Sequence, residues 1–347
     1  MEDPDQGYAI AMEPVDRAVQ CVNLEEKGQK LFKIAQNSEQ NQANNLKEFN
    51  EELKGLKKEE VTKLCQTKDD KENTVLHYAA KAGNLTVCQI LVLSGADINA
   101  TGQNGMKVLP FAARYGDEKK ANEVWACMSW IASEITGVVP ALPSAPAVVA
   151  EPTMQRLSSL MSVRKSLKMP PKEEKDITFG FFEKDKYNFS VLHHAIQNTN
   201  WVTDPVVVRN LISTQKFPIT ETDNQGNTCL HLAAQLDKLS DDKIFDVFFN
   251  NKHIPAEDIS ACISTKNDRG MTPVHIACAV GNHDSLEELL NACKRNHISL
   301  AGLINEQDKS GLLPLCHAIT SKNLKIVDAL LNEGAVVMKG SMLSAAR

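Results

Sequence analysis

A short block of similar sequence recurs along the chain, and it constrains the fold more than any other feature. Each strong copy has a Thr or Ser, two mostly apolar residues, a histidine and then small or apolar residues. The strong copies occupy 73–80, 190–196, 227–234 and 271–278, and weaker copies occupy 106–113 and 312–319. Recurrence of this kind predicts a repeat architecture, in which each unit buries its apolar face against its neighbours.

The block also predicts its own local structure. The Thr or Ser is suited to cap a helix, and an Asp or Asn five residues earlier is suited to close the preceding turn with its side chain. That earlier position holds Asp69, Asp185, Asp223, Asn267 and Asp308. The turn also needs a residue that tolerates positive φ. Gly105, Gly226, Gly270 and Gly311 meet this need, Asn188 is the next-best substitute, and Glu72 departs from the pattern.

At these positions the chain resembles the ankyrin-repeat family. The first copy matches the family pattern nearly end to end, from Asp69 through His77 and Gly83 to the stretch 95–100. The resemblance implies an all-α fold, an ankyrin-repeat solenoid of stacked helix pairs with short turn or hairpin connections. We expect six repeats, one for each copy. The segment 118–136 is a candidate for a further, degenerate repeat, with Val124, Met128 and Ile131 on a second helix.

The spacing of the copies is uneven. Counted from Thr74, successive copies follow at 33, 83, 38, 44 and 41 residues, whereas the family period is about 33. The later repeats must therefore carry extended loops or lengthened helices. We expect the segments 251–269 and 293–309 to project side by side and to offer apolar residues for an interface, namely Ile254, Ile259, Leu300 and Ile304.

Composition outside the repeats predicts the domain organisation. Residues 1–23 are poor in apolar residues and are predicted to be disordered, and 24–67 are predicted to form a helical N-terminal cap. Two blocks of repeats follow at 68–137 and 177–339, with a C-terminal tail at 340–347. Between the blocks, 138–176 is a Pro-rich and basic linker. Its part at 153–168 is basic and partly amphipathic, which suits a membrane surface or a partner's groove, although a solvated loop is the simpler interpretation.

Several classes of function lack support. His77, His193, His231 and His275 share one repeat position, but stacked repeats place them about 10 Å apart, too far for a shared metal. We expect each histidine to bond backbone in a turn instead. Neither Cys229 with His231 nor Cys278 with His275 has a third catalytic residue, and no phosphate-binding glycine loop occurs. No enzyme, metal or cofactor is predicted, and the net charge of −6 disfavours nucleic acid.

Binding is the function that the repeats support. Residues that the motif does not need, on the turns and the concave helix face, are free to contact a partner protein. The candidates are Met106, Arg114, Tyr115, Tyr187, Phe189, Gln225, Asn227, Arg269, Met271, Lys309 and Leu312. Because the extra residues lie in the later repeats, we expect the principal binding surface within 181–339.

Two hypotheses remain open at the level of sequence. The first is a non-enzymatic cytoplasmic adaptor that binds partner proteins. The second rests on a weaker resemblance to the N-terminal cytosolic ankyrin domain of TRPA-type cation channels, which also combines a helical leader with uneven repeats. It implies a regulatory fragment or short isoform of a channel, on the cytosolic side of a membrane. The longest uncharged stretch, 135–150, holds three prolines and is too short to cross a bilayer.

Overall fold

The structure is a computed structural model of the chain. It describes residues 14–37, 42–136, 184–198, 205–215, 217–236 and 243–337. The predicted linker at 138–176, including its basic part, and the predicted tail at 340–347 lie outside these residues. The described part is helical, and it contains isolated bridges such as Lys68 with Thr74 but no strand.

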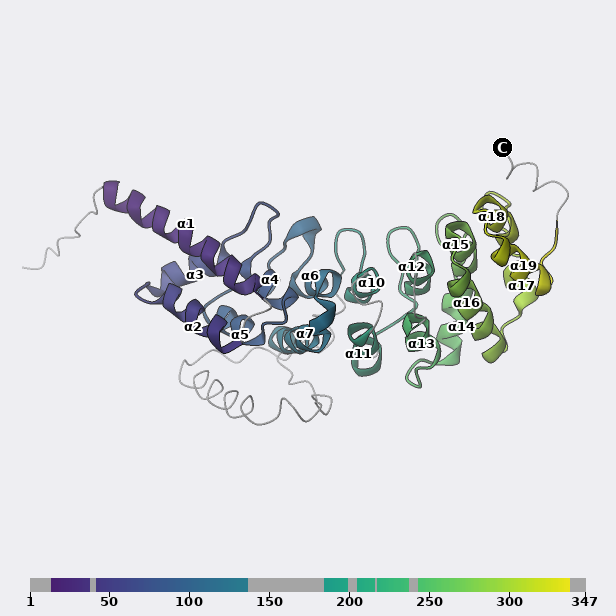
Figure 1. Ribbon diagram of the computed structural model, residues 1–347, viewed down its shortest axis with the longest axis horizontal. Helices are drawn as coiled ribbons and strands as arrows, with labels where there is room; N and C mark the ends of the chain where they lie inside the picture. The colour runs from purple at the N-terminus through teal and green to yellow at the C-terminus, as the bar shows by residue number, and fades with distance from the viewer. Residues whose placement is uncertain are drawn as a thin grey trace, which may run out of the picture.

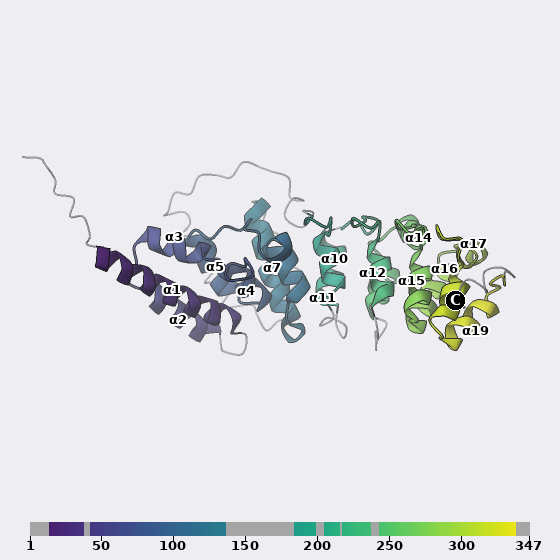
Figure 2. The ribbon, with the colours of Figure 1, turned by 90° about the horizontal axis from the view of Figure 1, so that it is seen from above.

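Six helix pairs follow one another along the molecule, one for each copy of the recurring block (Figure 1). They are α4 (Val75–Lys81) with α5 (Leu85–Leu93), α6 (Val108–Tyr115) with α7 (Ala121–Thr136), α10 (Val191–Ile196) with α11 (Val206–Gln215), α12 (Cys229–Gln235) with α13 (Lys243–Phe249), α15 (Pro273–Val280) with α16 (His283–Arg295), and α18 (Pro314–Thr320) with α19 (Leu324–Asn332). Seen from above in Figure 2, the pairs are arranged along the long axis. The predicted all-α solenoid is confirmed.

The segment 118–136 does not form a repeat of its own. A 3-10 turn at Glu118–Lys120 leads into α7, which packs as the second helix of the second repeat. Val124, Met128 and Ile131 are fully buried, as a second helix requires. The predicted helix is therefore present, but the additional repeat is wrong.

Three helices precede the first repeat: α1 (Pro14–Gln36), α2 (Gln42–Leu53) and α3 (Lys58–Gln66). α1 packs against α4 and α2 against α5, and Leu31 and Phe49 are buried there. Disorder was predicted up to residue 23, and this is wrong from Pro14 onward. Proline suits the first position of a helix because the amide it lacks would have no partner there.

The two runs of repeats are adjacent in the stack although 83 residues separate their copies in sequence. α6 packs against α10, and α7 against α11. The ends of α6 and α10 are also tied by hydrogen bonds. Arg114 donates to the Gln197 carbonyl, and the Asn198 amide donates to the carbonyls of Ala113 and Gly116 at 3.1 and 3.2 Å.

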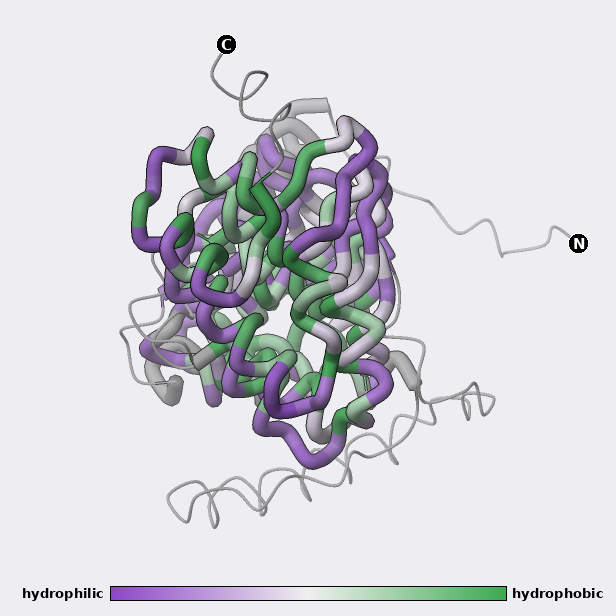
Figure 3. The backbone as a smooth tube through the Cα atoms, turned by 90° about the vertical axis from the view of Figure 1, so that its right-hand side faces the viewer, coloured by the Kyte–Doolittle hydropathy of each residue, from purple (hydrophilic) through white to green (hydrophobic). Residues whose placement is uncertain are grey.

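Small residues let neighbouring helices approach closely. The alanine pairs of α4, α6 and α12 are fully buried, and leucine, valine and isoleucine fill the space between the helix layers. Viewed along the stack, hydrophobic residues lie inside and hydrophilic ones on the outer turns (Figure 3). A continuous core of this kind holds a solenoid together.

The extra residues of the later repeats form short helices, α14 (Ala256–Ser264) and α17 (Leu300–Ile304). The two segments do meet, because the Lys266 ammonium contacts the Glu306 carboxylate and the Gln307 carbonyl. However, Ile259 and Ile304 are buried. The expectation that these two side chains contribute to an outer interface is wrong, since the stack itself covers them.

Candidate protein-binding surface

Each first helix is preceded by a five-residue turn, which we call a finger. The six fingers, numbered in chain order, are 69–73, 102–106, 185–189, 223–227, 267–271 and 308–312, and in Figure 1 they rise as loops above the first helices. In every finger the first residue's amide donates to the fifth residue's carbonyl, at 2.7 to 3.0 Å. In all fingers except the second, the first residue is Asp or Asn. Its side-chain Oδ1 accepts hydrogen bonds from the backbone amides of the third and fifth residues.

The fourth residue of every finger has positive φ. The values are 67° at Glu72, 75° at Gly105, 61° at Asn188, 73° at Gly226 and Gly270, and 74° at Gly311. These are the positions that the sequence pattern indicates. Glycine adopts this conformation without the steric cost that a Cβ atom brings. The finger therefore has a geometry that its own sequence determines.

In four repeats the recurring histidine bonds the residue that caps the first helix, directly after the finger, and in three of them it also bonds the next repeat. Its Nδ1 lies 2.6 to 2.9 Å from the hydroxyl of the capping Thr or Ser. The Nε2 atoms of His77, His231 and His275 lie 3.3, 2.9 and 3.1 Å from the carbonyls of Met106, Met271 and Glu306. His193 makes the first contact only, and its Nε2 has no hydrogen-bond partner.

Burial keeps these rings neutral. It lowers the pKa of His77, His193, His231 and His275 to about 4, because a buried imidazolium loses its hydration. Burial likewise raises the thiol pKa of Cys229 and of Cys278, so neither sulfur is an activated nucleophile. His77, His231 and His275 are thus structural links between repeats.

Backbone hydrogen bonds connect the tips of fingers three to six into one row. In fingers four to six, the backbone amide of the second residue donates to the carbonyl of the third residue in the preceding finger. The pairs are Asn224 to Tyr187 at 3.1 Å, Asp268 to Gln225 at 2.9 Å and Lys309 to Arg269 at 3.0 Å. These bonds fix the spacing between tips, so the exposed side chains at the tips stand in a set order.

The structure divides the predicted binding residues into three groups. Tyr187, Gln225, Arg269 and Lys309 are exposed at finger tips, with Tyr187 at 48%. Arg114, Tyr115, Phe189 and Leu312 are half-buried. Met106, Asn227 and Met271 are 2%, 8% and 6% exposed. Those last three side chains are buried, so we correct the prediction for them; partner contact by the others stays a prediction.

The fifth finger residue is buried in fingers one, two, four and five and half-buried in fingers three and six. Its carbonyl closes the finger and, at Met106 and Met271, also accepts the histidine of the preceding repeat. The second finger residue points outward instead, and the sequence prediction overlooked it except at Lys309. Lys186, Asn224 and Asp268 all occupy this exposed position. Their place directly after the turn-closing Asp or Asn is the signal that identifies them.

Arg114 makes a contact with the next repeat, and Tyr115 makes one within its own helix. The Arg114 guanidinium donates to the carbonyl of Gln197 in the next repeat, and burial lowers the pKa of this guanidinium. The Tyr115 ring lies 4.9 Å from the Phe111 ring, centroid to centroid. Both contacts restrict how these side chains can turn toward a partner.

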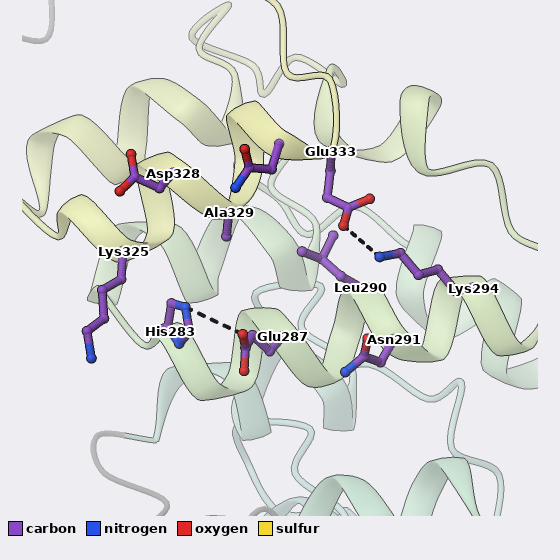
Figure 4. Close-up of a pocket in the computed structure, with 10 residues that line it drawn as sticks. His283, Glu287, Leu290, Asn291, Lys294, Lys325, Asp328, Ala329 and Glu333 are labelled. Atoms are coloured by element: carbon purple, nitrogen blue, oxygen red, sulfur yellow. Dashed lines mark hydrogen bonds and ion pairs between the residues drawn. The ribbon is translucent and has the colours of Figure 1, made fainter.

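A second concave feature lies between α16 and α19, away from the fingers. This cavity of about 480 Å³ is lined by charged side chains from both helices (Figure 4). Lys294 pairs with Glu333 at 2.6 Å across it, and His283 Nε2 lies 3.7 Å from Glu287. Lys294 and Glu333 neutralise one another here, whereas the finger row holds exposed side chains in a fixed order, so the finger row is the better candidate for binding a partner.

The fold and fingers define a class of protein: a solenoid of helix pairs with projecting turns, whose repeats serve as interaction modules. The family model for ankyrin repeats (3 copies) matches residues 34–124 and 240–340, more than half of the chain. The chain belongs to the ankyrin-repeat family. The third repeat lies outside both matches, yet its finger and helix pair follow the same plan. No curated protein matches the chain. Among the described helices none is long and apolar enough to cross a membrane.

Proposed function

We propose that the chain is a non-enzymatic cytoplasmic adaptor that binds partner proteins through its finger tips and first-helix face. The principal surface lies within 181–339, at fingers three to six. One observation supports this most. The tip-to-tip hydrogen bonds fix the backbone of the fingers, and the side chains exposed at the tips are not needed to form the repeat. A fixed row of such side chains loses little conformational freedom when a partner binds.

Aromatic and arginine residues are frequent energetic anchors of protein interfaces. Tyr187 and Arg269 supply one of each in this row, and both are exposed. Removing them should weaken a partner's binding without disturbing the core, because neither side chain packs inside the stack. Met271 is unsuitable for such a test, since its truncation would damage the buried side of the finger.

Affinity capture with the full chain, followed by identification and quantification of the captured protein, tests the proposal. The double variant Tyr187→Ala with Arg269→Ala should lose most of the capture at an unchanged melting temperature. The matched control is Lys252→Ala with Lys325→Ala, two exposed residues on the side of the second helices. Equal capture by the wild type and the finger variant would contradict the assigned surface.

A further inference from the structure

The exposed large apolar side chains of the described chain are concentrated at one end of the stack. Five of the six lie within 280–337, namely Val280, Leu324, Leu331, Val336 and Val337. Four of these five belong to α19 or to the residues that follow it, at the end of the molecule opposite α1 (Figure 1). Single exposed apolar residues are ordinary on a protein surface, whereas a cluster of them marks a contact surface.

The side of the sixth repeat that faces away from the fifth has the composition of a buried interface. Ile319 and Val327 are half-buried there and Leu331 is 43% exposed, with no described helix packed on them. In the fifth repeat, α18 and α19 pack against α15 and α16. The equivalent residues of that repeat are 0%, 0% and 4% exposed, namely Cys278, Leu286 and Leu290. A repeat that ends a solenoid needs a polar outer face to stay soluble, and this one is apolar at all three positions.

The apolar residues of α19 form a continuous stripe. Leu324, Val327 and Leu331 follow one another at i, i+3 and i+7, which places them on one face of the helix. The fifth repeat has His283 where the sixth has Leu324, so the stripe is more apolar than its counterpart on α16. We call Ile319, Leu324, Val327 and Leu331 the outer face of the sixth repeat.

The stripe is suited to pack against a copy of itself. Val327 lies near its middle, three residues after Leu324 and four before Leu331. When two α19 helices pack antiparallel about Val327, Leu324 of each helix lies against Leu331 of the other. A two-fold axis produces a contact of this kind between identical surfaces.

The charges beside the stripe favour the same antiparallel arrangement. Lys325 and Asp328 both lie on α19 (Figure 4), are exposed, and make no ion pair with another described residue. Because they are three residues apart, they share one flank of the helix. In an antiparallel pair that flank meets its own copy, and Lys325 of each helix faces Asp328 of the other. In a parallel pair each of these residues would face its own like charge.

We propose that the outer face of the sixth repeat binds the same face of a second copy of this chain, with the two α19 helices antiparallel. The apolar stripe supplies most of the affinity. The two Lys325–Asp328 pairs select the orientation, since exposed ion pairs contribute more to specificity than to affinity. The resulting end-to-end dimer carries two finger rows and can engage a partner at two places. None of the four outer-face residues belongs to a finger, so this inference goes beyond the proposed function and does not rest on it.

The dimer should be weak. Four apolar residues and two ion pairs on each side make a small interface, of the size found in transient complexes. We expect a dissociation constant of about 10 to 100 µM. Unfolding measured at about 1 µM therefore reports the monomer, because the stability that a partner subunit adds depends on its concentration.

Sedimentation equilibrium of the full chain over a range of concentrations tests the proposal. The wild type should change reversibly from monomer to dimer as its concentration rises. Leu331→Glu places a carboxylate against the apolar stripe and should weaken the association by about tenfold or more. The matched control is Tyr187→Glu, which makes the same charge change at a side chain that is 48% exposed in finger three, and it should leave the association unchanged. A wild type that stays monomeric at every concentration, or equal losses in the two variants, would overturn the proposal.

A charge exchange tests the antiparallel arrangement. Lys325→Asp brings two carboxylates together at each of the two contacts and should weaken the dimer by about three- to tenfold. Adding Asp328→Lys to the same chain restores opposite charges across the interface and should recover the wild-type affinity. Melting temperatures establish that every variant folds. An unchanged affinity in the single variant, or no recovery in the double variant, would contradict the antiparallel pairing and overturn the proposal.

Discussion

The fifth and sixth repeats share a local plan but differ in what surrounds them. Both have a finger closed by an Asn or Asp side chain, a glycine with φ near 73°, and a second helix capped by an asparagine, Asn282 or Asn323. The fifth repeat lies between two neighbours. Beyond the sixth, no described helix packs. The comparison separates what a repeat's own sequence determines from what its neighbours add.

The second helices show the effect of the neighbour most directly. Leu290 and Leu331 stand at the same place relative to their capping asparagines, yet Leu290 is 4% exposed and Leu331 is 43% exposed. The residue type is the same and so is the local structure. α19 of the next repeat packs against α16, whereas no described helix packs on the outer side of α19, and burial against a neighbour is how a solenoid gains stability.

The largest expected effect follows from this pair. Leu290→Ala should lower the free energy of unfolding by about 2 to 5 kcal/mol, because it leaves a cavity in a packed interface. Leu331→Ala should change it by no more than about 0.5 kcal/mol, as for other exposed positions. Urea unfolding of both variants measures the difference. Similar losses would mean that the outer side of the sixth repeat is also packed.

The finger glycines give the next comparison. A Cβ atom on Gly270 would lie 2.6 Å from the Lys309 amide nitrogen, whereas one on Gly311 would meet nothing within 4 Å. Gly311→Ala should therefore cost about 1 to 2 kcal/mol from positive φ alone. Gly270→Ala should cost about 1 to 3 kcal/mol more, because the sixth finger must shift. Chemical denaturation of the two variants checks this order, and equal costs would argue against close contact between the fingers.

The fifth repeat has a histidine that bonds the next repeat, and the sixth repeat lacks it. His275 bonds the Thr272 hydroxyl and the Glu306 carbonyl, while the sixth repeat has Cys316 at the equivalent place. His275→Ala leaves buried polar groups without partners and should cost about 1 to 3 kcal/mol. Cys316→Ala removes one sulfur atom and should cost about 1 kcal/mol or less. A larger loss for Cys316→Ala would contradict the linking role of the histidine.

Contacts within one repeat are predictable from the sequence, whereas contacts between repeats are not. Asp223 accepts the amide of Asn227, and Thr228 bonds His231, all within nine residues, so a local pattern is sufficient to predict these contacts. The Met271 carbonyl is bonded by His231, forty residues away, and Ile304 is buried in the core that the stacked helices share. Spacing alone does not indicate such long-range contacts. For that reason the fold and the finger geometry were predicted well, whereas three of the candidate binding residues proved to be buried.

The smallest expected effect is a difference between the fifth and sixth repeats in how their stability depends on pH. Burial, followed by the nearby His317 ring, lowers the pKa of His275 to about 4, while an unfolded histidine titrates near 6.5. Between these values the unfolded chain binds the extra proton, so this part of the stability is complete above pH 6.5 and decreases as the pH falls toward 4. In the sixth repeat, hydrogen bonds from Leu312 and His317 outweigh burial and hold the pKa of Asp308 below its usual value of 3.8. Its contribution is complete above that value and is lost only at still lower pH.

Variants at His275 and at Asp308 should therefore differ in how mild acid changes their stability relative to wild type. The difference in unfolding free energy between wild type and His275→Ala should shrink by about 1 kcal/mol between about pH 7 and pH 5.5, because only the wild type retains this histidine's penalty for protonation. The difference between wild type and Asp308→Asn should remain nearly constant over the same range, since the Asp308 carboxylate stays ionised throughout. Urea titrations at the two pH values give both quantities. A constant difference for His275→Ala would mean that water reaches the ring in the folded protein, and that the link between the fifth and sixth repeats opens in solution.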